Sequence, residues 1–156
     1  MVMLSYLGIA AGICGLDLLI KETVNTQIKE NEKIYTCENK VIVTKYHNPG
    51  AALGALKENP CVLKGVTLFG LGSLVGGLSA LSERKGFGLQ KLGLSMMLGG
   101  AVSNAYERFR YGKVTDYIRF NFGNEKFRTI VYNMGDFAIF VGGFFVCIGE
   151  IICKEK

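Results

Sequence analysis

The stretch IVYNMGDFAIFVGGFFVCIGEIIC, residues 130–153, decides the fold of this chain because it is long and apolar enough to cross a bilayer. A membrane-spanning helix needs about 20 mostly apolar residues. Similar runs predict three further spans, near residues 2–20, 62–81 and 89–106. The run at 89–106 is the weakest, since Lys91 and Asn104 interrupt its apolar centre.

Two aspartates lie in or beside the last run: Asp136 within it and Asp116 in the preceding VTDYI. A carboxylate at the centre of a spanning helix costs about 2.5–3.5 kcal/mol on insertion scales, so chains keep one mainly for chemistry, ion transport or internal pairing. We predict two carboxyl groups brought together at a membrane surface. The alternative is that each pairs with a nearby base, Asp116 with Lys113 or Arg119 for example.

A close pair of carboxyl groups has a defined chemistry. At a separation of about 3–5 Å the two groups do not both ionise readily, so one keeps its proton. Such a pair can take a proton from water and give one to a leaving amine, as peptide hydrolysis requires. If the two aspartates meet, they form a candidate catalytic dyad.

The predicted fold is an all-α membrane protein of four transmembrane helices, forming one domain over residues 1–156. A small β-rich lobe is expected between helices 1 and 2, because 33–37 and 40–46 read as a hairpin. Between helices 3 and 4, residues 117–131 alternate aromatic with polar side chains and are predicted to lie along the headgroups as an amphipathic segment. The single histidine, His47, is predicted to be a turn residue.

Composition argues against several other classes. The first apolar run has no Lys or Arg before Lys21 and no A-x-A site, so we expect a retained helix rather than a cleaved signal peptide. Five cysteines without C-x-x-C or Cys/His spacing predict no metal site. The net charge of +5 lies in loops and suits anionic lipid headgroups; no nucleic-acid partner is expected.

Further polar residues fall at the level of the two aspartates. Asp17 and Lys21 are four residues apart near one end of the first helix, so they share a helix face and can pair. An ion pair with a snorkelling lysine at the helix end explains that spacing equally well. The same sharing of a face is expected for Asn104 with Arg108, and for Asn133 with Asp136.

These residues fall into ordered blocks that resemble those of the lipoprotein signal peptidases (signal peptidase II), the intramembrane aspartyl proteases of bacteria. The blocks are spread over almost the whole chain. Each block alone is weak evidence for the resemblance, but five blocks in the right order are specific. They are Asp17-x-x-x-Lys21, Asn48-Pro49-Gly50-Ala51-Ala52, Gly99-Gly100-Ala101-x-x-Asn104-x-x-x-Arg108, Val114-x-Asp116-Tyr117 and Tyr132-Asn133-x-x-Asp136-x-Ala138-Ile139.

The resemblance implies an aspartic endopeptidase of the bacterial cell membrane with Asp116 and Asp136 as its catalytic pair. Its substrate would be a diacylglyceryl-modified prolipoprotein, cleaved on the amino side of the lipidated cysteine, with membrane lipid as the other partner and no cofactor. We expect a monomer, although no sequence feature sets the oligomeric state. The residues that would support the substrate and the pair are Asp17, Lys21, Asn48, Gly50, Asn104, Arg108 and Asn133.

Four positions depart from the family's blocks. Glu107 replaces an aspartate, Leu53 an aromatic residue, Gly135 an alanine and Phe137 a small residue. None of them is one of the two aspartates. These departures suggest a divergent member, with altered substrate choice or inhibitor response.

Orientation and function each keep an alternative. The family implies an extracytoplasmic active face and cytoplasmic termini, whereas the basic residues gathered on that face would make it cytoplasmic by the positive-inside rule. A non-catalytic paralogue that binds lipoproteins or signal peptides is one rival. A small transporter or proton-relay protein is another, and it would predict broken helices or repeated spans, which the sequence lacks.

Overall fold

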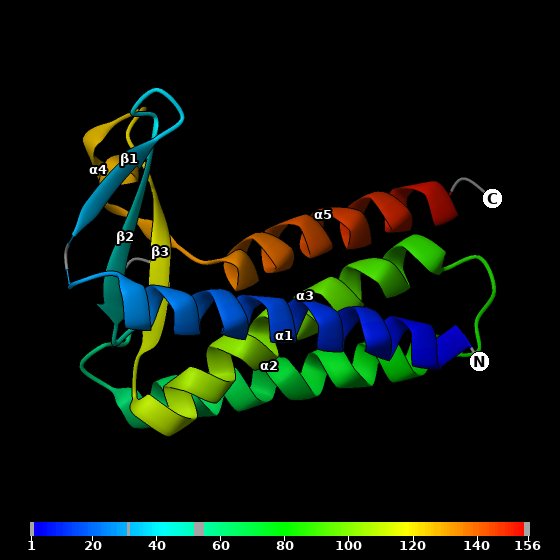
Figure 1. Ribbon diagram of the computed structural model, residues 1–156. Coiled ribbons are helices and arrows are strands. Elements are labelled where there is room, and N and C mark those ends of the chain that lie inside the picture. Colours follow the sequence, from blue (N-terminus) through cyan, green and yellow to red (C-terminus); the bar gives the residue numbers. More distant parts are fainter. Residues whose placement is uncertain (1, 31, 52–54, 155–156) are drawn as a thin grey trace.

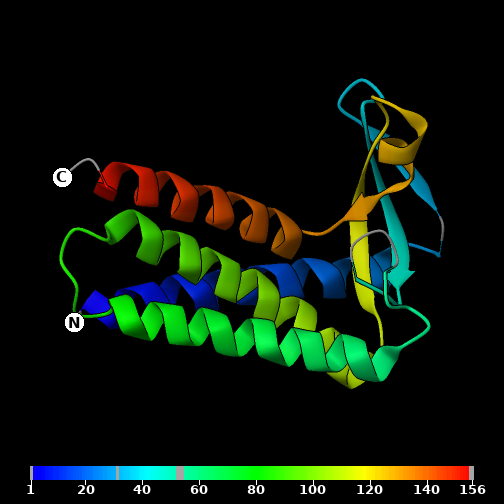
Figure 2. The ribbon, with the colours of Figure 1, turned by 180° about the vertical axis from the view of Figure 1, so that it is seen from behind.

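Four long helices lie side by side, with a small sheet across one end (Figure 1). The computed structural model describes residues 2–30, 32–51 and 55–154. The helices are α1 (Val2–Gln27), α2 (Pro60–Leu81), α3 (Gly88–Tyr111) and α5 (Met134–Lys154). The start of α1, the end of α5 and the α2–α3 connection lie at the end away from the sheet, which Figure 2 shows from behind.

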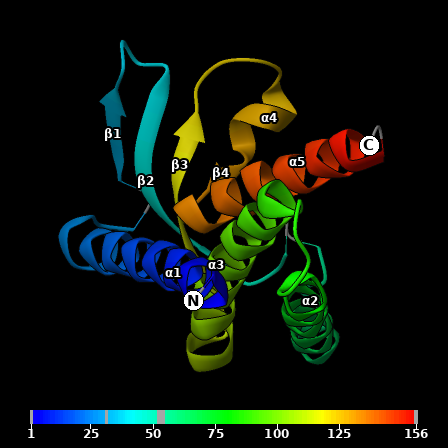
Figure 3. The same cartoon turned by 90° about the vertical axis from the view of Figure 1, so that its right-hand side faces the viewer.

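Among the described residues, α1, α2 and α5 are long and apolar enough to cross a membrane. The chain is therefore a mostly helical membrane protein with a small antiparallel sheet. The third predicted run, 89–106, falls within α3, which is not one of these three helices. Its position explains its polarity, because α3 packs against α1, α2 and α5 and lies between them (Figure 3).

Glycines let α3 and α5 approach backbone to backbone. A Cβ added at Gly100 would lie 2.2 Å from the carbonyl oxygen of Gly135, and one added at Gly142 would lie 2.5 Å from that of Gly93. No side chain fits at such distances. This contact fixes the start of α5, and with it Asp136, against the end of α3 that carries Asn104.

The sheet has the strand order β1-β2-β3-β4 and is antiparallel throughout. Its strands are β1 (Lys33–Thr36), β2 (Val41–Asn48), β3 (Val114–Phe120) and β4 (Val131–Tyr132). The predicted hairpin is confirmed, with Thr36 opposite Val41 and a turn between them. His47 differs from its prediction as a turn residue: it lies in β2, opposite Thr115 of β3.

The segment 117–131 also differs from its prediction. It is not one amphipathic stretch, because residues up to Phe120 belong to β3 and pair with β2. A short helix, α4 (Glu125–Thr129), and β4 follow. Aromatic side chains of this region stack on one another; the rings of Phe120 and Phe127 lie 5.7 Å apart.

The helix bounds agree with the predicted spans to within a few residues, except that α1 continues to Gln27 rather than ending near residue 20. Its last turns contact β2 and β3, so polar residues there meet protein partners. Two residues noted in the sequence lie outside the described residues: Ala52, which ends the second motif block, and Leu53, which departs from the family's pattern.

Candidate active site

Gly112 places Asp116 next to the end of α3. It adopts the left-handed conformation (φ 74°), and its N–H donates to the carbonyl of Arg108 at 3.1 Å, which closes the helix. Glycine is favoured there because a Cβ would strain this conformation. The chain then turns directly into β3, where Asp116 is opposite Tyr46 of β2.

Asn133 fixes Asp136 at the start of α5. The Asn133 side-chain oxygen accepts from the Asp136 N–H at 2.9 Å, and the Asp136 carboxyl accepts from the Asn133 N–H at 3.1 Å. This reciprocal arrangement is a helix cap that also sets the direction of the carboxyl group. The positive end of the helix dipole favours a negative charge at this place.

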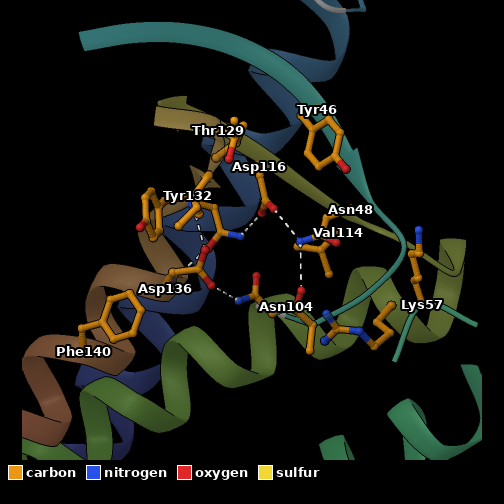
Figure 4. A pocket seen from close by; sticks show the side chains of 15 residues that line it. Tyr46, Asn48, Lys57, Asn104, Val114, Asp116, Thr129, Tyr132, Asp136 and Phe140 are labelled. Carbon is orange, nitrogen blue, oxygen red and sulfur yellow. Dashed lines mark hydrogen bonds between the residues drawn. The ribbon is translucent and has the colours of Figure 1, made fainter. Parts of the chain in front are cut away.

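The two aspartates meet through the same asparagine. Asn133 donates its amide to Asp116 Oδ1 at 2.6 Å while its backbone holds Asp136. Two further amides complete the set: Asn48 donates to Asp116 Oδ2 and Asn104 to Asp136 Oδ1, each at 3.0 Å (Figure 4). Each of the four carboxyl oxygens thus accepts one N–H. In the described part of the chain Asp116 forms no ion pair, with Lys113, Arg119 or any other base.

Asp116 is only 3 % exposed. Burial, and after it the nearby charge of Asp136, raise the pKa of Asp116 to about 7, while the hydrogen bonds from Asn48 and Asn133 act in the opposite direction. A carboxyl group with such a pKa carries a proton in a large fraction of molecules at neutral pH. One proton shared by two carboxyl groups is the arrangement that acid and base catalysis by a dyad needs.

Both carboxyl groups line a cavity of about 470 Å³. Arg108 reaches it from α3 and donates through Nη2 to the carbonyl oxygen of Gly50 at 3.0 Å. The buried Nε of the same guanidinium has no hydrogen-bond partner within the described residues. Apolar and aromatic side chains line another part of the cavity: Val114, Ile130, Val131, Tyr132 and Phe140.

The predicted Asp17–Lys21 pair is confirmed, with Nζ and Oδ2 2.8 Å apart, and both side chains are buried. Lys21 does not snorkel. Its ammonium donates to Asn104 Oδ1 at 2.7 Å and lies 3.4 Å from the carboxylate of Glu107. The Asn104 amide in turn donates to Asp136. The buried ion cluster of Asp17, Lys21 and Glu107 therefore helps to hold the asparagine that binds this aspartate.

Several residues of this support were not singled out from the sequence. Tyr117 donates to Asp17 at 3.1 Å and accepts from the N–H of Met134 at 2.9 Å. Glu107, noted only as a departure from the family, accepts from both the N–H and the hydroxyl of Thr115. The sequence signal for Tyr117 is its place in the block Val114-x-Asp116-Tyr117, whereas Thr115 occupies the unspecified position of that block.

Within the described ranges, no group of three or more His, Cys, Asp and Glu side chains could hold a metal ion. The polar groups that line the cavity are the two carboxyls, three asparagine amides, the guanidinium of Arg108, the amine of Lys57 and the hydroxyls of Tyr46, Thr129 and Tyr132.

Comparison with known proteins identifies the family. A family model described as signal peptidase (SPase) II matches residues 9–152. The lipoprotein signal peptidase of Clostridioides difficile (strain 630) is 32% identical over 151 residues, covering 97% of each chain. That of Moorella thermoacetica is 30% identical over 142 residues, covering 91% of this chain and 89% of the relative.

Solved structures support the fold. A bacterial membrane enzyme determined by the in meso method at 2.3 Å resolution superposes with a TM-score of 0.82 at 21% identity, covering 94% of this chain and 87% of that one. A second, at 1.9 Å resolution, gives a TM-score of 0.77 at 22% identity, with coverages of 92% and 90%. From the family model and the relatives together, this chain belongs to the signal peptidase II family.

Proposed function

We propose that this chain is an aspartic endopeptidase that removes signal peptides from diacylglyceryl-modified prolipoproteins, cutting on the amino side of the lipidated cysteine. The observation that carries the proposal is that Asn133 bonds to both Asp116 and Asp136 at the edge of a cavity. Membership of the signal peptidase II family supports the peptidase activity and the class of substrate.

In the proposed mechanism the aspartates share one proton. The ionised carboxylate takes a proton from water as the water oxygen attacks the scissile carbonyl carbon, and the protonated carboxyl gives its proton toward the carbonyl oxygen. Collapse of the tetrahedral intermediate breaks the C–N bond and gives a carboxylate and the amine of the cysteine, which receives a proton from the dyad. The Arg108 guanidinium and the Asn48 amide line the same cavity and are the candidate hydrogen-bond donors to the oxygens of this tetrahedral intermediate.

The proposed topology has four spans, the active face outside and both termini in the cytoplasm. The length of α3, 24 residues, supports its role as the fourth span, since it corresponds to about 36 Å of helix against a hydrocarbon core of about 30 Å. Six of its polar residues are buried against neighbouring elements rather than facing lipid: Gln90, Lys91, Ser95, Ser103, Asn104 and Glu107. The substrate's acyl chains would meet the apolar wall of the cavity, at Phe140 for example.

Labelling with a membrane-impermeant thiol reagent tests this topology. With the other four native cysteines replaced by serine, Cys37, exposed in the β1–β2 turn, should react from outside intact cells. With all five native cysteines replaced by serine, Lys85→Cys should react only after the cells are opened. Lys85 is chosen over Gly86, whose φ of 86° would strain a side chain. The reverse pattern would mean that the positive-inside rule holds and the proposed orientation is wrong.

The pH dependence of cleavage follows from the raised pKa of Asp116, about 7. A raised pKa means that the folded protein favours the protonated carboxyl, so the proton is present below pH 7 and lost above it. If catalysis needs that proton, kcat should fall about tenfold between pH 6 and pH 8. A rate that is flat or rises over this range would contradict a shared proton at Asp116.

Arg108 should not tolerate lysine. Its planar guanidinium donates to Gly50 while lining the cavity of the aspartates, and a lysine ammonium does not reproduce that planar set of donors. We expect Arg108→Lys to reduce kcat/KM about 10²-fold, equivalent to about 2.7 kcal/mol. Arg110, which stacks on exposed Tyr106 and Tyr111, is the control and should keep near-normal activity as lysine. Equal, mild losses at both positions would remove Arg108 from the site.

The enzymatic proposal is tested by giving the purified protein a diacylglyceryl-modified prolipoprotein and the same precursor without the lipid. We expect cleavage of the lipidated form only. Binding of lipidated precursor without cleavage would favour the non-catalytic paralogue instead. No specific observation favours a transporter.

A further inference from the structure

A second cavity, of about 450 Å³, lies on the opposite face of β3 from the cavity of the two aspartates. Successive residues of a strand point to opposite faces, so Thr115 faces this cavity while Asp116 faces the first. His47 also lines the second cavity and is the only histidine of the chain. The histidine is in contact with the last turns of α1 through Asn25.

The donor and the acceptor of each hydrogen bond beside this cavity can be deduced one bond after another. Glu107 accepts from the Thr115 N–H and lies 3.4 Å from the ammonium of Lys21, which is the setting of a carboxylate. A carboxylate only accepts, so the Thr115 hydroxyl, 2.7 Å away, donates to it. The hydroxyl oxygen then accepts from Asn25 Nδ2 at 3.1 Å.

This leaves the Asn25 side-chain oxygen facing His47 Nε2 at 3.2 Å, where it can only accept. The other ring nitrogen, Nδ1, lies 3.1 Å from a carboxylate oxygen of Glu30. Both ring nitrogens therefore face acceptors. An imidazolium donates to both, whereas a neutral ring has one N–H and can satisfy only one of them.

We propose that His47, as an imidazolium, is a positioning residue that ties the end of α1 to the back of the strand pair holding Asp116. The inference rests on the proposed function for its effect on catalysis. His47 does not line the cavity of the aspartates, so it acts through the residues it holds. Glu30 is itself placed by a bridge to Lys45 of β2, two residues before His47.

A continuous series of contacts connects the ring to the dyad. Each step is a hydrogen bond of at most 3.2 Å or the one ion pair at 3.4 Å. The series runs His47, Asn25, Thr115, Glu107, Lys21, Asn104, Asp136. Losing the first bond frees Asn25 and, through it, the orientation of Thr115 beside Asp116.

Charged groups near the His47 ring come from α1 and the residue Glu30 that follows it, from β2, and from the end of α3 and the turn after it. Among the described residues, Glu30 is the one that contacts the ring directly. Lys45 donates to the Asn25 carbonyl oxygen at 3.2 Å, and the remaining groups line the same cavity. The full set is Glu30, Lys45, Glu22, Lys21, Glu107 and Lys113.

Glu30→Gln separates the proposal from a merely structural role. A glutamine amide can donate to a neutral Nδ1, so this variant lets the uncharged ring keep both bonds. We divide the kcat of the wild-type protein by the kcat of Glu30→Gln at each pH. This ratio should fall about threefold between pH 6 and pH 8, and the KM of each protein should not change. The dyad's own pH dependence is common to both proteins and cancels in this ratio. Glu38→Gln, at an exposed pair with Lys40, is the control and should give a constant ratio.

A second measurement does not depend on activity. The difference in unfolding temperature, wild type minus Glu30→Gln, should also decrease from pH 6 to pH 8. The reason is that the ion pair between His47 and Glu30 forms only while the ring is protonated. A kcat ratio and a temperature difference that are both independent of pH would overturn the proposal. If neither protein cleaves the lipidated precursor, the proposed function fails, while the unfolding temperatures still decide whether His47 is held as an imidazolium.

Discussion

Replacing either Asp116 or Asp136 by asparagine is expected to abolish cleavage of a diacylglyceryl-modified prolipoprotein. General acid and base groups contribute about 10²–10⁴-fold each, and an amide can neither take a proton from water nor return one to the leaving amine. Asparagine has nearly the shape of aspartate and retains one acceptor for the bonds from Asn133, Asn48 or Asn104. We therefore expect loss of activity without loss of fold, measured as cleavage rate together with unfolding temperature.

The control for this pair is Glu38→Gln, which removes a carboxyl group from an exposed turn residue. It should leave cleavage unchanged. Turnover close to that of wild type in either aspartate variant would rule out the aspartyl mechanism.

Lys21→Met is expected to have the largest effect on stability. The side chain is 1% exposed and lies within 3.4 Å of carboxylates on Asp17 and Glu107, so its removal leaves two buried charges uncompensated. Breaking a buried ion pair from one side costs about 3–5 kcal/mol. For a chain of this size that corresponds to a fall of about 6–20 °C in the unfolding temperature.

A lysine in an exposed pair provides the contrast. Lys40 lies 3.2 Å from Glu38, with both side chains more than half exposed, and such pairs contribute about 0–1 kcal/mol. Lys40→Met should shift the unfolding temperature by about 4 °C at most. Similar shifts for the two variants would show that the buried cluster does not hold α1 against α3.

The parts of the fold that the sequence predicted are those set by local pattern. Residues 62–81 were expected as a span and α2 covers Pro60–Leu81, because its apolar length alone requires a helix. The Asp17–Lys21 pair followed from helical spacing. The five motif blocks suggested that Asp116 and Asp136 belong to one site, and the structure joins them through Asn133.

What could not be predicted depends on pairing between distant segments. The local pattern predicts an amphipathic stretch at Phe120, although this residue lies opposite Val41 in the sheet. Nothing local shows that residues 114–120 add to a hairpin some 70 positions earlier. For the same reason the local sequence predicts a turn at His47, since its partners Asn25 and Glu30 are close only in the folded chain.

The central claim, that two aspartates hydrolyse the peptide bond before a lipidated cysteine, is tested most directly by the mass spectrum of the products. Purified wild-type protein and a synthetic diacylglyceryl lipopeptide spanning the cleavage site are sufficient. We predict two fragments whose masses sum to the substrate plus one water, with the lipidated cysteine as the new amino terminus, and none with Asp136→Asn. Cleavage at another bond, or the same fragments from Asp136→Asn, would contradict the claim.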